Sequence, residues 1–580
     1  MARRRGQWSV LALNGVTAGG VLILVAVLAL VVKPPAPPGI AAFAPQASKP
    51  ITKAPLAQSA QFGTGSGRCG AGQVCTLRST PTPAASLPPG VKPQPSATAR
   101  GGVPSALQCY DWPNGAVTQT FDPQSPPCIA SWDDAKGNGG ATSPGVTGTD
   151  INVALPINSA SPTWPLLKPL VDFVNSRFQL YGRKIHIVTV ASQQANEQVQ
   201  AKFNDPSAQR ADASQIAALK PFASFDFVDP LNYSMSLPEF RSVLTQHHVI
   251  SLAGGDTAPS GTAQDLTKGQ PYEWTYTPTV DTIVRNVAAM MCRQLVGRPA
   301  THATDVSLRS KTRKFAALLP TDAMIGGEMP GLPEMQSMLK ACGVSDFPVV
   351  RYDYAAGNKA ARTAALRKLA DDGVTSVVFL PEGGNQTSGP LAEATQVNYH
   401  PEWIVIGAHK YLADNMLANP EQTSGAFGVG GWNKMPPLAL EMWAQSYTAG
   451  GGDPSAVNNG SLTDGRAFYN ELLLLASGIQ LAGPHLTPQS FAAGLHTTTF
   501  PNPGAASAPL YQATVGFGTN GVTMIDDVNA FWFSKEMSGA QVNNSTDNNT
   551  YQATCYVRLG RRYSLDSWPT TDGFLQGPCR

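Results

Sequence analysis

Apolar and polar residues alternate in two distinct rhythms from residue 145 onward. Short, nearly continuous apolar runs are typical of parallel strands that are buried on both faces. Longer stretches with apolar residues three or four positions apart indicate amphipathic helices. We expect strands at 151–157, 184–191, 222–228, 249–254, 272–279, 314–320, 347–354, 376–381 and 402–408. We expect helices at 164–182, before about 220, at 237–248, at 281–296, before 342 and at 358–373.

The order of these elements predicts an α/β fold with doubly wound parallel sheets, because strands and helices alternate. One run of strand–helix units ends near residue 296, and a second begins at 314. The two runs do not fit one sheet well, so two similar lobes are expected. Ligands of such sheets bind beyond the carboxyl ends of the strands.

The chain begins with a short basic segment that is followed by a long apolar stretch. Arg3, Arg4 and Arg5 precede an uncharged stretch at 8–32. As a helix it would span ~37 Å at ~1.5 Å per residue, more than the ~30 Å hydrocarbon core of a bilayer. The arginines favour a cytoplasmic N-terminus, so the rest of the chain would lie outside the cell. We expect residues 1–33 to form a cytoplasmic tip and a single-pass membrane anchor; a cleaved signal peptide is the alternative.

Two further segments separate this stretch from the predicted sheets. Residues 34–107 are rich in Pro, Ala, Ser and Gly, a composition that cannot bury enough apolar surface to form a core. We expect them to form a disordered stalk. Residues 108–144, with Cys109 and Cys128, are expected to form a Cys-bounded extension that packs on the main domain.

The chain has eight cysteines, and an even number in an exported protein indicates disulfide bonds. We expect sequence neighbours to pair, as Cys69–Cys75, Cys109–Cys128, Cys292–Cys342 and Cys555–Cys579. Free buried thiols are the alternative, above all for Cys292 and Cys342. The spacings match no zinc pattern, since they include no CxxC and no nearby pair of histidines.

The composition and the motifs exclude several classes of protein. Charged residues make up only 14% of the chain, and 41 Lys and Arg nearly balance 39 Asp and Glu, which argues against a nucleic-acid-binding protein. The sequence contains no GxxxxGK[ST], HExxH or GxSxG motif. A GxGxxG match at 516–521 precedes a strand-like run and predicts a hairpin turn. We expect neither an enzyme nor a bound metal or cofactor.

Four segments resemble those of a known family. They are "GVTGTDINVALPINSA" (145–160), "VISLAGGDTAP" (249–259), "YEWTYTPTVDTIVRNVA" (272–288) and "VGFGTNGVTMIDDVNAFWF" (515–533). In this order and spacing they resemble the type I periplasmic-binding proteins, in particular the branched-chain amino acid receptors of ABC importers. The resemblance covers about 145–580.

This resemblance implies two doubly wound lobes that are joined by three crossovers and close on a solute in the cleft between them. Lobe 1 is expected at about 145–298 and 425–510, and lobe 2 at about 299–424 and 511–580.

The resemblance also implies that the first-lobe ligand contacts come from two loops, here 229–236 and 251–257. We carry over Tyr233, Ser234, Ser251, Gly255, Asp256 and Thr257, and we expect Asp322, Gly383, His409 and Trp432 to add further ligand contacts. Backbone N–H groups and hydroxyls in such loops bind a carboxylate, and an aromatic ring covers an apolar part. For each residue, a turn that satisfies only local backbone groups is the alternative.

The second lobe departs from the family pattern at two places. Ile325 lies near the position of a usual Tyr, and His409 and Lys410 follow the strand after which an acidic residue usually holds the ligand ammonium. A cation there repels an ammonium and attracts an anion, so an anionic or neutral solute is favoured over an ordinary α-amino acid.

The function expected is therefore that of a membrane-anchored extracellular receptor. It would capture a small amino-acid-like, amide or organic anion solute for an ABC importer, with an ABC permease as partner and without nucleic acid. The alternative is a surface sensor or scaffold that uses the same fold without transport.

Overall fold

The computed structural model describes the residues from 109 to 570 with several gaps. The described ranges are 109–111, 117–157, 164–194, 205–226, 238–252, 262–321, 328–353, 358–381, 389–408, 419–431, 441–458, 465–502, 513–525, 527–533, 541–543, 550–552, 555–556 and 562–570. The predicted anchor (1–33) and stalk (34–107) lie outside them. Among the helices within these ranges, none combines the length and the apolar character needed to cross a membrane.

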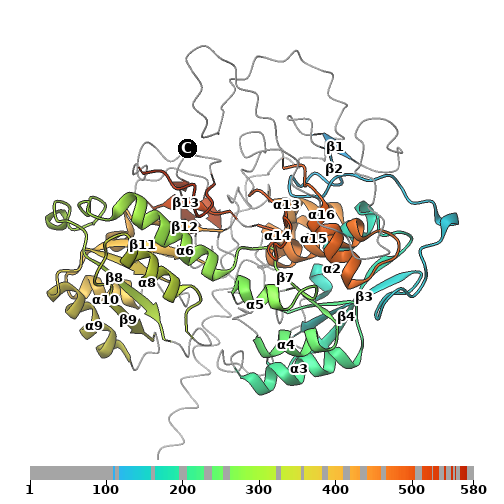
Figure 1. Cartoon of the computed structure of the whole chain (residues 1–580), viewed down its shortest axis with the longest axis horizontal. Coiled ribbons are helices and arrows are strands. Elements are labelled where there is room, and N and C mark those ends of the chain that lie inside the picture. Colours follow the sequence, from blue (N-terminus) through green and yellow to red (C-terminus); the bar gives the residue numbers. More distant parts are fainter. Residues whose placement is uncertain are drawn as a thin grey trace, which may run out of the picture. The chain divides into compact units, whose positions relative to one another are not determined.

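The first sheet is parallel and contains strands β3 to β7 (Figure 1). The strands are β3 (Asp150–Ile157), β4 (Lys184–Ala191), β5 (Ala223–Phe225), β6 (Ile250–Leu252) and β7 (Glu273–Trp274), in the order β4-β3-β5-β6-β7. In chain order this is the second, first, third, fourth and fifth strand, one of the common doubly wound orders. Helices α2 (Trp164–Arg177), α3 (Pro206–Ala218), α4 (Pro238–Gln246) and α5 (Ala263–Lys268) connect the strands.

The second sheet repeats this order in its parallel part. Its parallel strands are β8 (Phe315–Pro320), β9 (Val349–Tyr352), β10 (Ser376–Phe379), β11 (Glu402–Gly407) and β12 (Phe427–Gly430), in the order β9-β8-β10-β11-β12. Two antiparallel strands, β13 (Asn529–Trp532) and β16 (Cys555–Tyr556), extend it beyond β12. Its helices are α6 (Val280–Met290), which continues in a π-helical turn (Met291–Leu295), α8 (Leu332–Ala341), α9 (Lys359–Asp371), α10 (Pro390–Gln396) and α12 (Pro420–Thr423).

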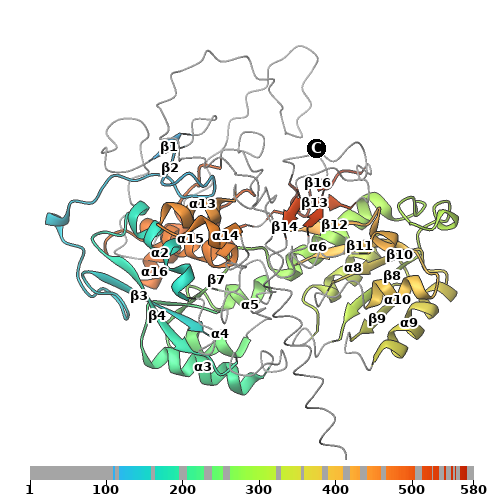
Figure 2. The same ribbon diagram turned by 180° about the vertical axis from the view of Figure 1, so that it is seen from behind.

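Helices cover both faces of each sheet (Figure 2). On one face of the first sheet lie α2 and the later helices α13 (Met442–Ala449), α15 (Gly465–Ala482) and α16 (Pro488–Thr497), with α14 (Pro454–Asn458) between them in the chain. On the other face lie α3 and α4. In the second sheet, α6 and α8 cover one face, and α9 and α10 the other. The remaining strands form small pairs, β1 (Tyr110–Asp111) with β2 (Val117–Thr118) and β14 (Gln541–Asn543) with β15 (Thr550–Gln552).

Local sequence accounts for several element boundaries. The side chain of Asp205 caps the start of α3 by accepting from the Ser207 N–H, and Pro206 occupies the first helical position. Thr487 and Ser490 form a capping box at the start of α16. The helix expected at 164–182 ends earlier, at Arg177.

The α/β fold with parallel sheets is confirmed, and each predicted strand is present, although the one expected at 272–279 spans only Glu273–Trp274; the predicted lobe boundaries are wrong at three places. α6 packs into the core of the second sheet, whereas the sequence places residues up to 298 in lobe 1. β12 lies in the second sheet, whereas 425–510 is expected in lobe 1. Val515 and Met524 lie in the first core, whereas 511–580 is expected in lobe 2. Apolar periodicity shows that a segment has a buried face, but it does not show which sheet buries that face.

Two of the predicted disulfides are confirmed. Cys109 pairs with Cys128 and Cys292 with Cys342, with Cα–Cα distances of 5.9 and 5.7 Å. The alternative of free thiols at 292 and 342 is therefore wrong. Cys69, Cys75 and Cys579 lie outside the described residues, and of Cys555 only the backbone is described.

The Cys-bounded extension packs on the first lobe, as predicted. The Tyr469 hydroxyl on α15 donates to Asp122 Oδ2 over 2.9 Å, and the Gln124 N–H donates to Asp122 Oδ1 over 2.9 Å. Asp122 is buried, and this burial raises its pKa from 3.8 to about 6 in spite of both hydrogen bonds.

The raised pKa of Asp122 predicts a pH dependence of stability. The folded state favours the protonated form of Asp122, so protonation of this carboxyl stabilises the protein. This stabilisation is fully present below pH 3.8 and is lost as the pH rises through about 6. The contribution corresponds to about 3 kcal/mol at most. In Asp122→Asn this dependence should disappear, so that urea unfolding between pH 4 and pH 7 gives a flatter profile than in the wild type. Parallel profiles for the two proteins would contradict the assignment.

Candidate ligand-binding site

The carboxyl ends of parallel strands meet at one edge of each sheet, and the segments that follow them begin there. After β3, β4, β5 and β6 of the first sheet these segments include 158–163, 195–204, 227–237 and 253–261, and after the parallel strands of the second sheet they include 322–327, 354–357, 382–388, 409–418 and 432–440. All of them lie outside the described residues. The predicted contacts that fall on them are Tyr233, Ser234, Gly255, Asp256, Thr257, Asp322, Gly383, His409 and Trp432. These contacts stay predictions.

Ser251 is the predicted contact that the structure describes. It lies in the middle of β6, is fully buried, and its N–H donates to the Tyr272 carbonyl over 2.6 Å. Ile250 and Leu252 face the core under α2 and α15, so Ser251 faces α3 and α4, in register with Ser224. Its Oγ finds no hydrogen-bond partner among the described residues. A role of Ser251 in ligand binding stays a prediction.

A buried ion cluster supports the carboxyl edge of the first sheet. Arg241 on α4 lies 3.9 Å from Asp226 and 3.4 Å from Glu273, measured between the charged atoms. Asp226 directly follows β5 and immediately precedes the segment with Tyr233. Thr245 donates to Glu273 over 2.9 Å. Burial raises the pKa of Glu273, and the charge of Arg241 opposes this shift.

The turn after β4 is fixed by a side chain of α3, which covers the same face of the first sheet as α4. Asp212 on α3 is fully buried and accepts from Ser192 Oγ at 2.5 Å, from the Gln193 N–H at 2.8 Å and from Gln194 Nε2 at 3.1 Å. One carboxylate therefore holds three successive residues at the point where the chain leaves the sheet. A buried charge that is saturated in this way positions the backbone and is not itself available to a ligand.

The second sheet has a similar arrangement. Arg362 on α9 forms a bidentate pair with Glu393 on α10, with a shortest N–O distance of 2.7 Å, and also donates to the Asp353 carbonyl after β9. The Tyr352 hydroxyl donates to the Leu380 carbonyl over 2.8 Å. The ends of β9 and β10 are thus tied together where segments 354–357 and 382–388 begin.

Three crossovers connect the two sheets, as the resemblance implies. They are Thr275–Thr279 between β7 and α6, residues 431–441 between β12 and α13, and Ile525–Val528 before β13. The first and third pair along their backbones: the Thr275 N–H donates to the Val522 carbonyl, and the Met524 and Ile525 N–H groups donate to the Thr275 and Tyr276 carbonyls, over 2.8 to 3.1 Å.

A single arginine joins the second crossover to the third. Arg562 Nε lies 2.7 Å from Asp527 Oδ1, and its Nη2 donates to the Asp527 carbonyl and to the Gly431 carbonyl over 2.8 and 3.1 Å. At Gly431 a Cβ would lie 2.6 Å from Cγ of Pro278, so only glycine fits between these crossovers without a shift.

The predicted hairpin turn at 516–521 is confirmed, and it leads into the third crossover. Val515 bridges Ile525 in antiparallel fashion, and the Gly516 N–H donates to the Met524 carbonyl over 3.0 Å. Gly518 has a φ of 51°, in the left-handed region that glycine adopts readily. This GxGxxG match is therefore a turn that leads into the third crossover and not a dinucleotide site.

Sequence reasoning missed Arg241, Asp212, Arg362 and Arg562. Asp226 carried a signal, since it is a charge inside the apolar run 222–228. The arginines carried none, because each partner lies far away in the sequence. Across the ranges that the structure describes, no group of three His, Cys, Asp or Glu side chains could hold a metal ion.

Comparison with known proteins finds similarity in solved structures. No family model and no curated protein matches the chain. A branched-chain amino acid ABC transporter protein from Thermus thermophilus with bound valine is 12% identical, with a TM-score of 0.45, over 72% of this chain and 97% of that one. An ABC transporter substrate-binding protein from Desulfitobacterium hafniense in complex with Leu is 16% identical, with a TM-score of 0.41, over 67% and 98%.

A solute-binding protein of an ABC transporter from Rhodopseudomonas palustris, in complex with 3,4-dihydroxybenzoic acid, is 11% identical, with a TM-score of 0.44, over 72% of this chain and 98% of that one. All three are ABC transporter proteins, the kind of protein that the sequence resembles. With such low identities and TM-scores, the fold class itself rests on the repeated strand order in the two sheets.

The ion cluster at the first edge makes a prediction for stability. Arg241→Ala leaves Asp226 and Glu273 buried without their cation and should lower the free energy of unfolding by about 3–5 kcal/mol. Arg210→Ala is the matched control, because Arg210 on α3 forms an exposed pair with Glu239 on α4, the helix that carries Arg241, and its loss should cost about 1 kcal/mol or less. Urea unfolding followed by tryptophan fluorescence measures both. Equal losses in the two variants would show that the cluster does not support the edge.

Proposed function

We propose that this chain is a membrane-anchored extracellular receptor that captures a small solute between its two lobes and presents it to an ABC importer. The observation that carries the proposal is the pair of hydrogen-bonded crossovers between two sheets of the same strand order. Such crossovers allow two rigid lobes to bend about a narrow hinge. A solute that contacts loops of both lobes adds contacts only when they close, so binding and closure are coupled.

The class of solute is inferred from the loops that follow the strands. Backbone N–H groups and hydroxyls at 229–236 and 251–257 suit a carboxylate or an amide. In the second lobe, His409 and Lys410 supply positive character where an ammonium would need an acid. We therefore propose an amino-acid-like, amide or organic anion solute, bound without chemical conversion.

Two segments of the sequence support the proposed location. The uncharged stretch at 8–32 follows three arginines and would hold the receptor at the cell membrane, with residues 34–107 as the spacer. The two disulfides agree with an oxidising compartment outside the cell. The sequence contains no P-loop, so the energy for transport would come from the importer's own ATPase.

Ligand release tests the binding function. Small molecules released from the purified full chain on denaturation are identified by mass spectrometry, and each is added back in a thermal melt. A true solute at 100 times its dissociation constant should stabilise the protein by about 2.7 kcal/mol. Tyr233→Ala and Asp256→Ala should abolish the shift, whereas Asp566→Ala, at an exposed position outside the predicted ligand loops, should keep it.

The opposite outcome also has a clear meaning. If no solute is released, and no shift follows with amino acids, amides, organic anions or small sugars, the receptor proposal is wrong. The surface sensor or scaffold would then be the better account of the chain.

Fractionation tests the anchor. In the producing cells the chain should stay in the membrane pellet after extraction at pH 11 and keep its N-terminal residues in the intact mass. Its mass should fall when protease is added outside the cell. Replacement of the 8–32 stretch by a cleavable export signal should release the protein into the soluble fraction. A mature N-terminus that begins after residue 32 would establish cleavage instead.

A further inference from the structure

The Cys-bounded extension contains a tight turn at 122–125. The Ser125 N–H donates to the Asp122 carbonyl over 3.0 Å, and the hydroxyls of Thr120 and Ser125 are hydrogen-bonded to each other. Residues 122 and 125 are 2% and 0% exposed, so the turn is not a surface loop. A polar turn that is buried in this way needs partners for its side chains, and the partners show what it does.

One side chain of this turn contacts two elements of the hinge. The Tyr276 hydroxyl, in the first crossover, donates to Gln124 Oε1. Gln124 Nε2 donates to the Ala513 carbonyl over 3.3 Å, and Ala513 begins the segment that leads through the hairpin to the third crossover. Gln124 is 2% exposed, so water does not compete for these bonds.

These contacts close into a ring with α15. Tyr469 on α15 donates to Asp122, and the Gln124 N–H donates to the same carboxylate. Glu471, two residues further on α15, accepts from the Tyr276 N–H over 3.2 Å. The extension, the first crossover and α15 are therefore joined in one buried circuit, so movement of Tyr276 relative to α15 disturbs several of its bonds.

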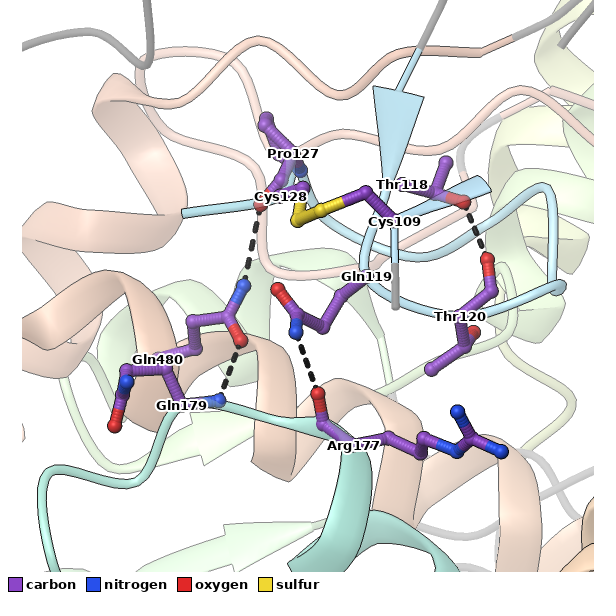
Figure 3. The surroundings of a disulfide bond; sticks show 9 residues. All are labelled: Cys109, Thr118, Gln119, Thr120, Pro127, Cys128, Arg177, Gln179 and Gln480. Carbon is purple, nitrogen blue, oxygen red and sulfur yellow. Dashed lines mark hydrogen bonds between the residues drawn. A yellow bond between two sulfur atoms is a disulfide. The ribbon is translucent and has the colours of Figure 1, made fainter. Parts of the chain in front are cut away.

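Further contacts fix the extension to α2 and α15 of the first lobe (Figure 3). The Cys109–Cys128 disulfide closes it at its base. Gln480 Nε2 donates to the Pro127 carbonyl over 3.2 Å, and Gln119 Nε2 donates to the Arg177 carbonyl at the end of α2 over 2.6 Å. These bonds stay within the first lobe, so they hold the extension in place without touching a crossover.

We propose that residues 117–128, fixed on the first lobe, act as a brace that limits bending of the first and third crossovers. The brace acts through Gln124 and Tyr276, and the remainder of the extension anchors it. This inference concerns the mobility of the hinge and holds whatever solute the lobes take.

Hydrogen exchange of the full chain, without any added ligand, tests the brace. Tyr276→Phe removes only the hydroxyl that contacts Gln124. The hinge amides of Thr275, Met524 and Ile525 should then exchange about fivefold faster, as expected for the loss of one buried hydrogen bond. The control is Tyr181→Phe, which loses a buried hydroxyl bond to the Gln480 carbonyl in the same lobe and should leave the hinge amides unchanged.

A second pair of variants keeps the test decisive if Tyr276→Phe folds poorly. Gln124→Ala removes both hinge contacts, whereas the control Gln246→Ala removes only a side-chain bond to Ser242 within α4 of the same lobe. Faster exchange at the hinge in Gln124→Ala alone supports the brace. Equal exchange at the hinge in both variants, or no change in Gln124→Ala, overturns it. Since no solute is present, a failed search for a ligand does not affect this result.

Discussion

A parallel sheet must be covered on both faces, because every connection between its strands has to cross over one face. This constraint explains most of the molecule. It requires the nearly continuous apolar strands, such as β10 and β11, whose residues are all buried. It requires helices on both sides, and it places all the segments that follow the strands at one edge. Two sheets of the same order therefore present two equivalent edges, on which side chains for a ligand can be arranged independently of the core.

The same constraint creates a problem at those edges, since strands end where polar backbone groups would otherwise be buried without partners. The chain solves it with charged side chains from the covering helices. Asp212 on α3 and Arg362 on α9 each bind a backbone group just beyond a strand, and Arg241 on α4 pairs with the Asp226 side chain that follows β5. Buried ion pairs of this kind add little net stability, but they fix the backbone where they bind it. This suits a receptor, in which the edge must be rigid while the loops beyond it bind the solute.

The sequence predicts the repeated strand–helix pattern well, because burial on both faces leaves a strong local signal. It predicts Cys109–Cys128 and Cys292–Cys342, because each pair consists of two cysteines that follow each other along the chain with no other cysteine between them. It does not predict which sheet α6 covers, since the apolar stripe with Val284 and Val287 would suit either core. It does not predict Arg562, whose partners Asp527 and Gly431 lie 35 and 131 residues away. Among the predicted ligand contacts, the structure describes Ser251. Its buried hydroxyl lies in the middle of a strand, and nothing in the neighbouring sequence indicates that it binds a ligand.

In the proposed receptor, the hinge formed by the crossovers must satisfy two opposing requirements. Its crossovers need few contacts, so that the contacts of one small solute can outweigh them; each 1.4 kcal/mol shifts the ratio of open to closed lobes about tenfold. It also needs enough contacts to keep two large lobes in register. The backbone pairing of Thr275 with Val522 and Met524 supplies the register. Side-chain bonds such as those of Gln124 and Arg562 can then adjust the resistance to bending by about a kilocalorie each without altering either sheet. A segment that precedes the first lobe in the chain, such as 117–128, can thus change how readily the two lobes move relative to each other, while the strand ends that face the ligand stay the same.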